Sequence, residues 1–220
     1  MFWRPAVISR ISRRLNDVDP SLIFLTVAIL IGGTIRLYGV LQSKFPINDG
    51  GLFYTMIKDL VANGYRLPVT TSYNHLGLPF AYPPVFLYLG GFLSDLTSWG
   101  LLNIIRVLPA VFTILSIPAF YLLARALIKD KTQVVLATFI FTFIPASFDW
   151  LVMGGGLTRS PAFFFALLSL YFIHRLYTQA RKLDILWVVL FSSLTILSHP
   201  ETALHTAASA VVFFLFFVVM

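Results

Sequence analysis

Asn48-Asp49-Gly50-Gly51 is the stretch around which the rest of the chain can be arranged. This acidic, glycine-containing corner lies near the start of the one long region, from Phe45 to about Asn103, that is not plainly apolar. The region is rich in prolines, tyrosines and turn-forming residues, and long apolar runs flank it on both sides. The sequence therefore predicts a polar loop region carried by membrane-spanning helices.

The composition is that of a membrane protein. Hydrophobic residues make up 58% of the chain and charged residues 11%, whereas charged residues make up about 25% of ordinary soluble domains. The chain has no cysteine, which excludes disulfides, thiol catalysis and cysteine-ligated metals. Because the basic residues behind the net charge of +7 cluster at predicted helix ends, we expect anionic lipid head groups as partners and no nucleic acid. The predicted fold class is an all-α polytopic membrane protein.

The first predicted span follows a basic N-terminal segment, residues 1–19. Asp19 is a favoured N-cap residue and Pro20 a favoured first helical residue. The apolar run from Ser21 to Leu41 has about the 20 residues that a span requires. It lacks a small-residue cleavage site, so we expect a retained anchor. Arg36 lies near its far end, where we expect its side chain to snorkel to the interface.

Two short helices are predicted inside the loop region, residues 43–103. The first has one apolar face, between Leu52 and Val61, and the Asn63-Gly64 pair is its stop signal. It is too short to span, so we expect it to lie in the membrane interface. Residues 65–82 predict irregular loop, and Pro83-Pro84 precede a second short apolar helix from Val85 to Leu96.

Five further apolar runs bring the predicted number of spans to about six. The runs cover residues 104–128, 133–148, 161–177, 185–197 and 202–220. Lys and Arg then concentrate on the connections that share a side with the N-terminus, which the positive-inside rule makes cytoplasmic. We therefore expect a multi-pass plasma-membrane protein, with residues 43–103 and a second loop at residues 149–160 on the external side. The last run has no polar stop, so we also expect the domain, residues 20–220, to be incomplete at its C-terminus.

The predicted topology gathers several ionisable side chains on the external side: Asp49, His75, Asp149, Arg159, His199 and Glu201. Ionisable residues at membrane depth or at a span end are costly to keep and often functional. This grouping is the main sequence signal for a site.

Four motifs carry a resemblance to a known family: Asn48-Asp49-Gly50-Gly51-Leu52-Phe53-Tyr54, Ala81-Tyr82-Pro83-Pro84-Val85-Phe86-Leu87-Tyr88, Arg106-Val107-Leu108-Pro109-Ala110 and Leu122-Leu123-Ala124-Arg125-Ala126-Leu127. With the order of span, long external loop and short helices, they resemble the GT-C membrane glycosyltransferases. Within that superfamily the arrangement is most similar to the protein O-mannosyltransferase and lipid A aminoarabinose transferase group. Such enzymes move a sugar from a polyprenyl-phosphate donor to an acceptor, which is a protein, a lipid or a glycan.

The resemblance implies roles for particular residues. Asp49 corresponds to the general base of the first loop, which accepts the acceptor's proton while the anomeric carbon is inverted. The leaving phosphate needs a facing cation, and Arg159, Arg106 and His75 are the candidates. Asp149 corresponds to the acidic second loop, where a divalent metal stays an open alternative. Many relatives carry a second acid where this chain has Gly50, which weakens a claim of metal dependence. Gly154, Gly155 and Gly156 could add an anion-binding backbone segment before a helix that starts at Pro161.

Each candidate also has a structural explanation. Asp49 could only cap the helix that starts at Gly50, and Asp149 and Arg159 could be ordinary interfacial residues. His199 and Glu201 could line the substrate cavity, as could Tyr82, but Ser198 and Glu201 also have the spacing of a capping box. Glu201 and His205 lie one turn apart, yet two ligands make a poor metal site. The alternative functions are a transporter or flippase for a lipid-linked or small polar substrate and a non-catalytic scaffold.

Overall fold

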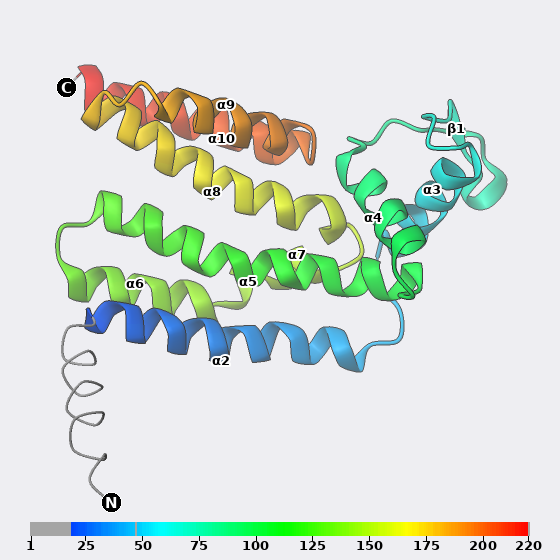
Figure 1. The fold of residues 1–220 in the computed structure, drawn as a ribbon, viewed down its shortest axis with the longest axis horizontal. Coiled ribbons are helices and arrows are strands. Elements are labelled where there is room, and N and C mark those ends of the chain that lie inside the picture. The colour runs from blue at the N-terminus through cyan, green and yellow to red at the C-terminus, as the bar shows by residue number, and fades with distance from the viewer. Residues whose placement is uncertain (1–18, 47, 220) are drawn as a thin grey trace, which may run out of the picture.

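The computed structural model describes residues 19–46 and 48–219, and helices make up most of that part of the chain (Figure 1). The elements are α2 (Pro20–Gln42), α3 (Gly50–Ala62), β1 (Thr70–Thr71), η1 (Tyr73–His75), β2 (Leu78–Pro79), α4 (Val85–Leu96), α5 (Leu101–Leu127), α6 (Lys131–Phe143), η2 (Pro145–Ser147), α7 (Asp149–Val152), α8 (Gly156–Gln179), α9 (Asp184–Ile196), α10 (Pro200–Phe214) and the π-helical turn η3 (Leu215–Val219). The predicted basic N-terminal segment lies outside the described residues except for Asp19.

The long helices lie side by side in one bundle (Figure 1). α5 packs against α2, α6 and α8, and α8 also packs against α9 and α10. The α3 and α4 helices and the β1–β2 ribbon gather at the end of the bundle where α2 ends and α5 begins, which we call the loop end. The opposite end, where α5 ends and α6 begins, carries Arg125, Lys129 and Lys131, and we call it the basic end.

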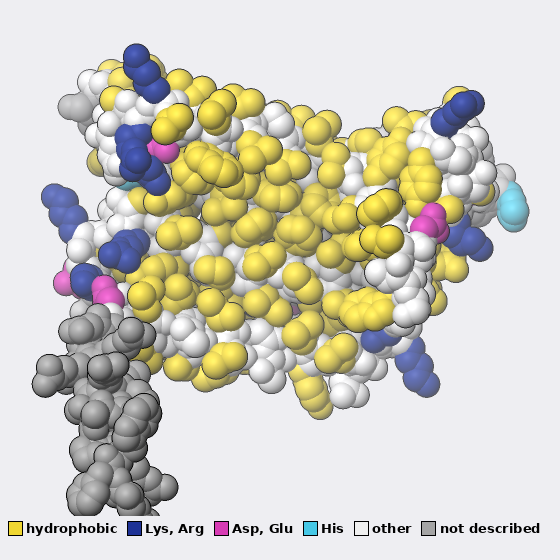
Figure 2. Space-filling view, in the orientation of Figure 1, with side chains coloured by type: hydrophobic (Ala, Val, Ile, Leu, Met, Phe, Trp, Pro, Cys, Tyr) yellow, Lys and Arg dark blue, Asp and Glu magenta, His cyan; other side chains and the backbone are white. Residues whose placement is uncertain are grey.

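The surface of the bundle is that of a membrane protein. Within the described residues, four helices are long and apolar enough to cross a membrane: Pro20–Gln42, Leu101–Leu127, Gly156–Gln179 and Pro200–Val219. Figure 2 shows hydrophobic side chains over most of the visible face of the bundle, with Lys and Arg side chains towards its two ends. Large apolar side chains such as Leu30 and Leu186 are 65% and 68% exposed. An apolar surface of this extent is covered by lipid or by other protein in a stable molecule.

The number of six spans stays a prediction, because α6 and α9 have only 13 residues each. A helix of that length is about 20 Å long, which is less than the roughly 30 Å of a bilayer's hydrocarbon core. The apolar run predicted to extend to Phe148 is broken: α6 ends at Phe143, and the chain continues through the single turn η2 into the short helix α7.

Arg36 stabilises this break. Its guanidinium donates hydrogen bonds to the backbone carbonyls of Phe141 (3.4 Å) and Thr142 (3.3 Å), to the hydroxyl of Ser147 (3.1 Å), and to the carbonyl of Thr113 in α5. A helix end leaves carbonyls without intrahelical partners, and in an apolar environment they must be satisfied within the protein. The prediction that Arg36 snorkels to the interface is wrong, because its side chain is 1% exposed.

The loop end has its own hydrophobic core, which joins α3 and α4 to the bundle. The predicted apolar face of α3 is confirmed, since Phe53, Met56, Ile57 and Leu60 are buried. They pack with Phe86 and Leu87 of α4, Ile105 of α5 and Leu157 of α8. This face is therefore turned to protein rather than to lipid, and amphipathicity does not place α3 in the membrane interface. The loop predicted to be irregular contains a short ribbon in which Thr70 pairs with Pro79 and Thr71 with Leu78.

The second predicted external loop, residues 149–160, is largely helical. α7 occupies its start, and α8 begins at Gly156, five residues before the predicted start at Pro161. Hydroxyl groups hold the turn that precedes the proline: Thr158 donates to the carbonyl of Gly155, and Ser160 donates to that of Gly156. Arg159 consequently lies within a helix, where its position is fixed.

We expect a methyl group at Gly32 to destabilise the bundle. A Cβ there would overlap the Thr142 methyl and lie 3.1 Å from Ile117 Cδ1. Overpacking of this kind costs about 1–3 kcal/mol. Gly39→Ala is the matched control, because a Cβ at Gly39 meets nothing within 4 Å and both changes raise helix propensity alike. Thermal unfolding in detergent should give a lower midpoint for Gly32→Ala than for Gly39→Ala; equal midpoints would contradict close packing of α2 on α6.

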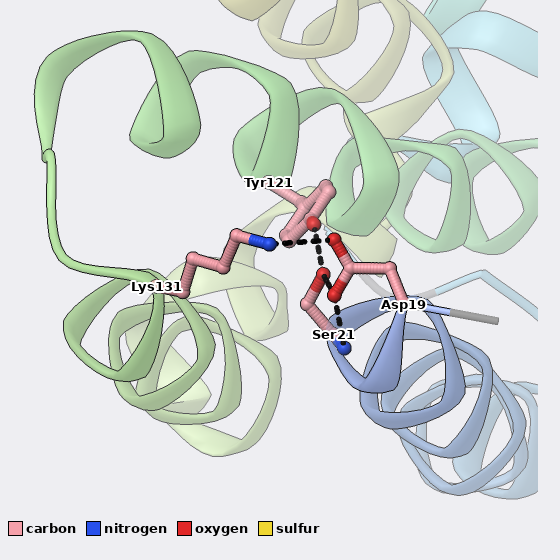
Figure 3. Close-up of polar contacts among 4 residues, drawn as sticks. All are labelled: Asp19, Ser21, Tyr121 and Lys131. Carbon is pink, nitrogen blue, oxygen red and sulfur yellow. Dashed lines mark hydrogen bonds and ion pairs between the residues drawn. The ribbon is translucent and has the colours of Figure 1, made fainter. Parts of the chain in front are cut away.

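We also expect the start of α2 to be sensitive to acid. Asp19 caps this helix, and the Ser21 backbone N–H and the Lys131 ammonium lower the pKa of Asp19 to about 2 (Figure 3). Because the ordinary value is about 3.9, this stabilisation is complete above pH 4 and is lost as the pH falls through 2. The unfolding midpoint should fall less between pH 4 and pH 2 in Asp19→Asn than in the wild type. A parallel loss in both proteins would show that Asp19 is not the titrating group.

Candidate functional site

Asp49 and Arg159 form an ion pair at the loop end. Asp49 occupies the N-cap position of α3, but its carboxylate makes no capping hydrogen bond. The Oδ2 atom instead lies 3.7 Å from Nη2 of Arg159, which the chain supplies from α8. The Asp49 carboxylate is therefore not oriented by helix capping. The sequence analysis predicted that Asp49 and Arg159 lie on the same side of the bundle, and the structure brings their side chains into contact.

The two partners differ in exposure. The side chain of Asp49 is 55% exposed and that of Arg159 only 9%. The guanidinium of Arg159 lies 4.1 Å from the centroid of the Trp150 ring, a cation–π contact. Within the described residues its Nη2 atom is buried without a hydrogen-bond partner. The site thus presents an accessible acid beside a nearly buried cation that has an unused donor.

Gly155 makes this contact sterically feasible, and Gly50 allows the close approach of Pro46. A Cβ at Gly155 would overlap the guanidinium of Arg159 and lie 3.0 Å from Asp49 Oδ2. A Cβ at Gly50 would lie 2.6 Å from Pro46 Cγ and 3.7 Å from Gly154 Cα. A side chain at position 50 would therefore collide with Pro46.

A cavity of about 300 Å³ lies between α2, α5 and α7, and neither Asp49 nor Arg159 is among its lining residues. Arg36, Arg106 and Asp149 contribute its charged groups, and most of its other lining is apolar. Met153 lines this cavity. It lies two residues before Gly155, where an added Cβ would meet both Arg159 and Asp49. Asp149 is exposed here, in the first turn of α7.

Arg106 is already engaged in the structure. It donates to the carbonyls of Val40 (3.0 Å) and Leu41 (3.3 Å) at the end of α2 and to Asn103 Oδ1 (3.2 Å). These bonds satisfy carbonyls at a helix C-terminus, where a basic side chain is also favoured by the helix dipole. Within the described residues, each of the two arginines predicted to bind phosphate keeps one buried donor without a hydrogen-bond partner, Nη2 in Arg159 and Nε in Arg106.

His199 lies near the pair but has a capping role. It is the N-cap of α10, and its Nδ1 accepts a hydrogen bond from the backbone N–H of Thr202. The predicted Ser198–Glu201 capping box is wrong, because Ser198 donates instead to the carbonyl of Leu194. Burial lowers the pKa of His199; the charge of Glu201 opposes this shift, and the charge of Arg159 adds to it. The neutral imidazole that results suits a hydrogen-bond acceptor at a helix start, and Glu201 beside it is exposed.

The structure does not bring His75 or Tyr82 to the pair. His75 lies in η1 and lines an open hollow with Asp59, Thr71 and Ser72, where the Asp59 carboxylate accepts hydrogen bonds from both hydroxyls. Tyr82 packs edge-on against Phe53, with their ring centroids 4.8 Å apart, and belongs to the loop-end core. Sequence reasoning missed Trp150, whose only signal was its place between an acid and the glycine run.

The part of the chain that the structure describes contains no cluster of metal-binding side chains. No group of three or more His, Asp or Glu side chains there is arranged to hold an ion. A metal at Asp149 stays a prediction.

We expect Gly155→Ala to separate Asp49 from Arg159 and to disturb the stacking on Trp150. The readout is the fluorescence of Trp150 in a background where Trp3, Trp99 and Trp187 are replaced by Phe. Emission and acrylamide quenching should change in Gly155→Ala and stay constant in Gly100→Ala, since a Cβ at Gly100 meets nothing within 4 Å. Unchanged Trp150 fluorescence in both variants would contradict the tight arrangement around the pair.

No family model, curated protein or solved structure matches the chain. A conclusion about function consequently depends on the residue motifs and on the geometry of the site.

Proposed function

We propose that this chain is the catalytic membrane part of a glycosyltransferase that moves a sugar from a polyprenyl-phosphate donor to a protein, lipid or glycan acceptor. The observation that carries the proposal is the Asp49–Arg159 pair, an exposed carboxylate 3.7 Å from a buried guanidinium. It lies at the loop end of an apolar helical bundle, and in the proposed orientation that end is external.

The pair supplies the two groups that the reaction requires. Asp49 accepts the proton of the acceptor hydroxyl or amine as the new bond to the anomeric carbon forms. The bond from that carbon to the phosphate oxygen breaks on the opposite face, which inverts the carbon. Its electron pair stays on the lipid phosphate, and Arg159 faces the charge that develops there. A 3.7 Å separation is long for a hydrogen bond. Within the described residues Nη2 of Arg159 therefore has no hydrogen-bond partner, and in the proposal the phosphate displaces Asp49 to reach this buried atom.

The neighbouring cavity supports a lipid-linked donor. Its apolar walls, which include Ile35, Phe148 and Val152, lie between helices. Met153 of the same lining is two residues from Gly155, which adjoins the ion pair. In the proposal the first isoprene units of the donor occupy this space, and the phosphate is held at the boundary between the cavity and Arg159. Arg106 contributes positive charge at the cavity wall.

One observation favours the alternative of a transporter or flippase. The crossing formed by α6, η2 and α7 is discontinuous, and a buried arginine lies at the break. Broken helices near the membrane midplane are typical binding sites in secondary transporters. Here, however, the donors of Arg36 bond the surrounding carbonyls, which leaves a structural explanation for the residue.

We expect Asp49→Asn to lower transfer by at least about 100-fold, the size of a general-base contribution. The substitution keeps the shape of the side chain and removes its ability to take a proton. Transfer from a labelled polyprenyl-phosphate sugar would be measured in membranes that contain the full chain, with several sugars. Asp95→Asn is the matched control, because Asp95 also lies at the loop end but bonds the Tyr65 hydroxyl.

Arg159→Lys tests the second group. The variant keeps the charge but loses the planar stacking on Trp150, so we expect a lower kcat for transfer with intact folding.

Full activity of Asp49→Asn would remove Asp49 from the role of base. Movement of the intact lipid-linked sugar across the membrane without transfer would instead establish the flippase alternative.

A further inference from the structure

The basic end of the bundle contains a pocket that the proposed reaction does not use. It has a volume of about 190 Å³ and lies where α2 begins, α5 ends and α6 begins. Its lining is Ser21, Tyr121, Arg125, Ala126, Ile128, Lys129, Lys131 and Val134. Three of these residues are cations, and the pocket is at the opposite end of the bundle from Asp49 and Arg159 (Figure 1).

A hydrogen-bonded network forms one wall of the pocket (Figure 3). The Ser21 hydroxyl donates to Asp19 Oδ1 at 2.9 Å and lies 2.9 Å from the Tyr121 hydroxyl. Lys131 Nζ lies 3.0 Å from the other carboxylate oxygen of Asp19. Ser21 and Tyr121 are buried, at 7% and 4% exposure. The network therefore holds a pair of hydroxyl groups rigidly at the pocket.

The charge of the pocket is positive after internal pairing. Lys131 is matched by Asp19, whereas neither Arg125 nor Lys129 makes an ion pair with any residue that the structure describes. Both side chains are exposed. Two cations at a small pocket are groups that bind a phosphate. The two hydroxyl groups form a rigid wall rather than donors, because Ser21 donates its hydrogen to Asp19 and Tyr121 therefore donates to Ser21.

We propose that this pocket binds the phosphate of an anionic phospholipid, with Arg125 and Lys129 as its cations and the Tyr121–Ser21 hydroxyl pair as a rigid wall beside them.

A lipid is the favoured source of the phosphate because of what surrounds the pocket. Ile128, Val134 and Ala126 complete the lining with apolar groups that suit a glycerol backbone. Leu22 and Leu127 are 45% and 42% exposed on the turns next to it, which provides apolar surface for acyl chains. Basic pockets between helices at a membrane surface bind anionic head groups in this way. The assignment is independent of the proposed glycosyl transfer.

The experiment is a titration of the full chain in detergent with phosphatidylglycerol and with phosphatidylcholine, followed by native mass spectrometry. The Arg125→Gln/Lys129→Gln variant should bind phosphatidylglycerol about 30-fold more weakly, since each basic residue near an anionic surface contributes about 1 kcal/mol. The matched control is Arg181→Gln/Lys182→Gln. It removes two exposed cations from the α8–α9 connection, which lies at the same end of the bundle.

The possible outcomes distinguish binding of the lipid in this pocket from general attraction of anionic lipid to surface charge. Selective loss in the Arg125/Lys129 variant supports the site. Equal loss in both double variants would overturn it in favour of diffuse surface charge. Displacement of the lipid by millimolar inorganic phosphate would overturn the lipid as ligand, and absence of phosphatidylglycerol binding by the wild type would overturn the proposal altogether. All substituted cations are exposed, and circular dichroism checks the fold of each variant.

Discussion

The guanidinium of Arg36 is the constraint on which the arrangement of the bundle depends. It joins three helices by bonding carbonyls of α5 and α6 and the hydroxyl of Ser147 after α6. Phe148 also stacks on it, with the charge 4.8 Å from the ring centroid. Removing such a buried cation leaves several acceptors without partners, each at a cost of about 1–3 kcal/mol. The chain can therefore leave helical geometry after Phe143 without exposing its backbone to an apolar environment.

The break determines where the site residues lie. Because α6 stops early, the chain turns through η2 and enters α7, which places Trp150 under the guanidinium of Arg159. α8 then begins at Gly156, and its second turn faces the start of α3. The loop-end core holds α3 against α5 and α8 through Ile105 and Leu157. The acid and the cation thus meet because of two separate packing arrangements. The bundle positions the start of α8, which carries Arg159, and the loop-end core positions the start of α3, which follows Asp49.

The sequence was sufficient for features that depend on local pattern. The Asp19 cap, the buried face of α3 and the short helix from Val85 follow from capping preference, periodicity and proline placement. It was insufficient where a tertiary partner decides the outcome. Arg36 near a helix end predicts snorkelling unless the carbonyls of Phe141 and Thr142 are known to be nearby. Ser198 matched a capping pattern, but the neighbouring His199 imidazole accepts the bond. Asp49 and Arg159 could be placed on one side, whereas their contact required the positions of α3 and α8.

Gly155 leaves space for the guanidinium of Arg159 beside the carboxylate of Asp49, and the pair carries no net charge. A phosphodiester that enters brings one negative charge and competes with Asp49 for the same guanidinium. Under the proposed reaction, arrival of the donor would separate the carboxylate from its counter-ion just when the acceptor must give up a proton. In that proposal the balance of one acid and one cation lets the donor itself release the base.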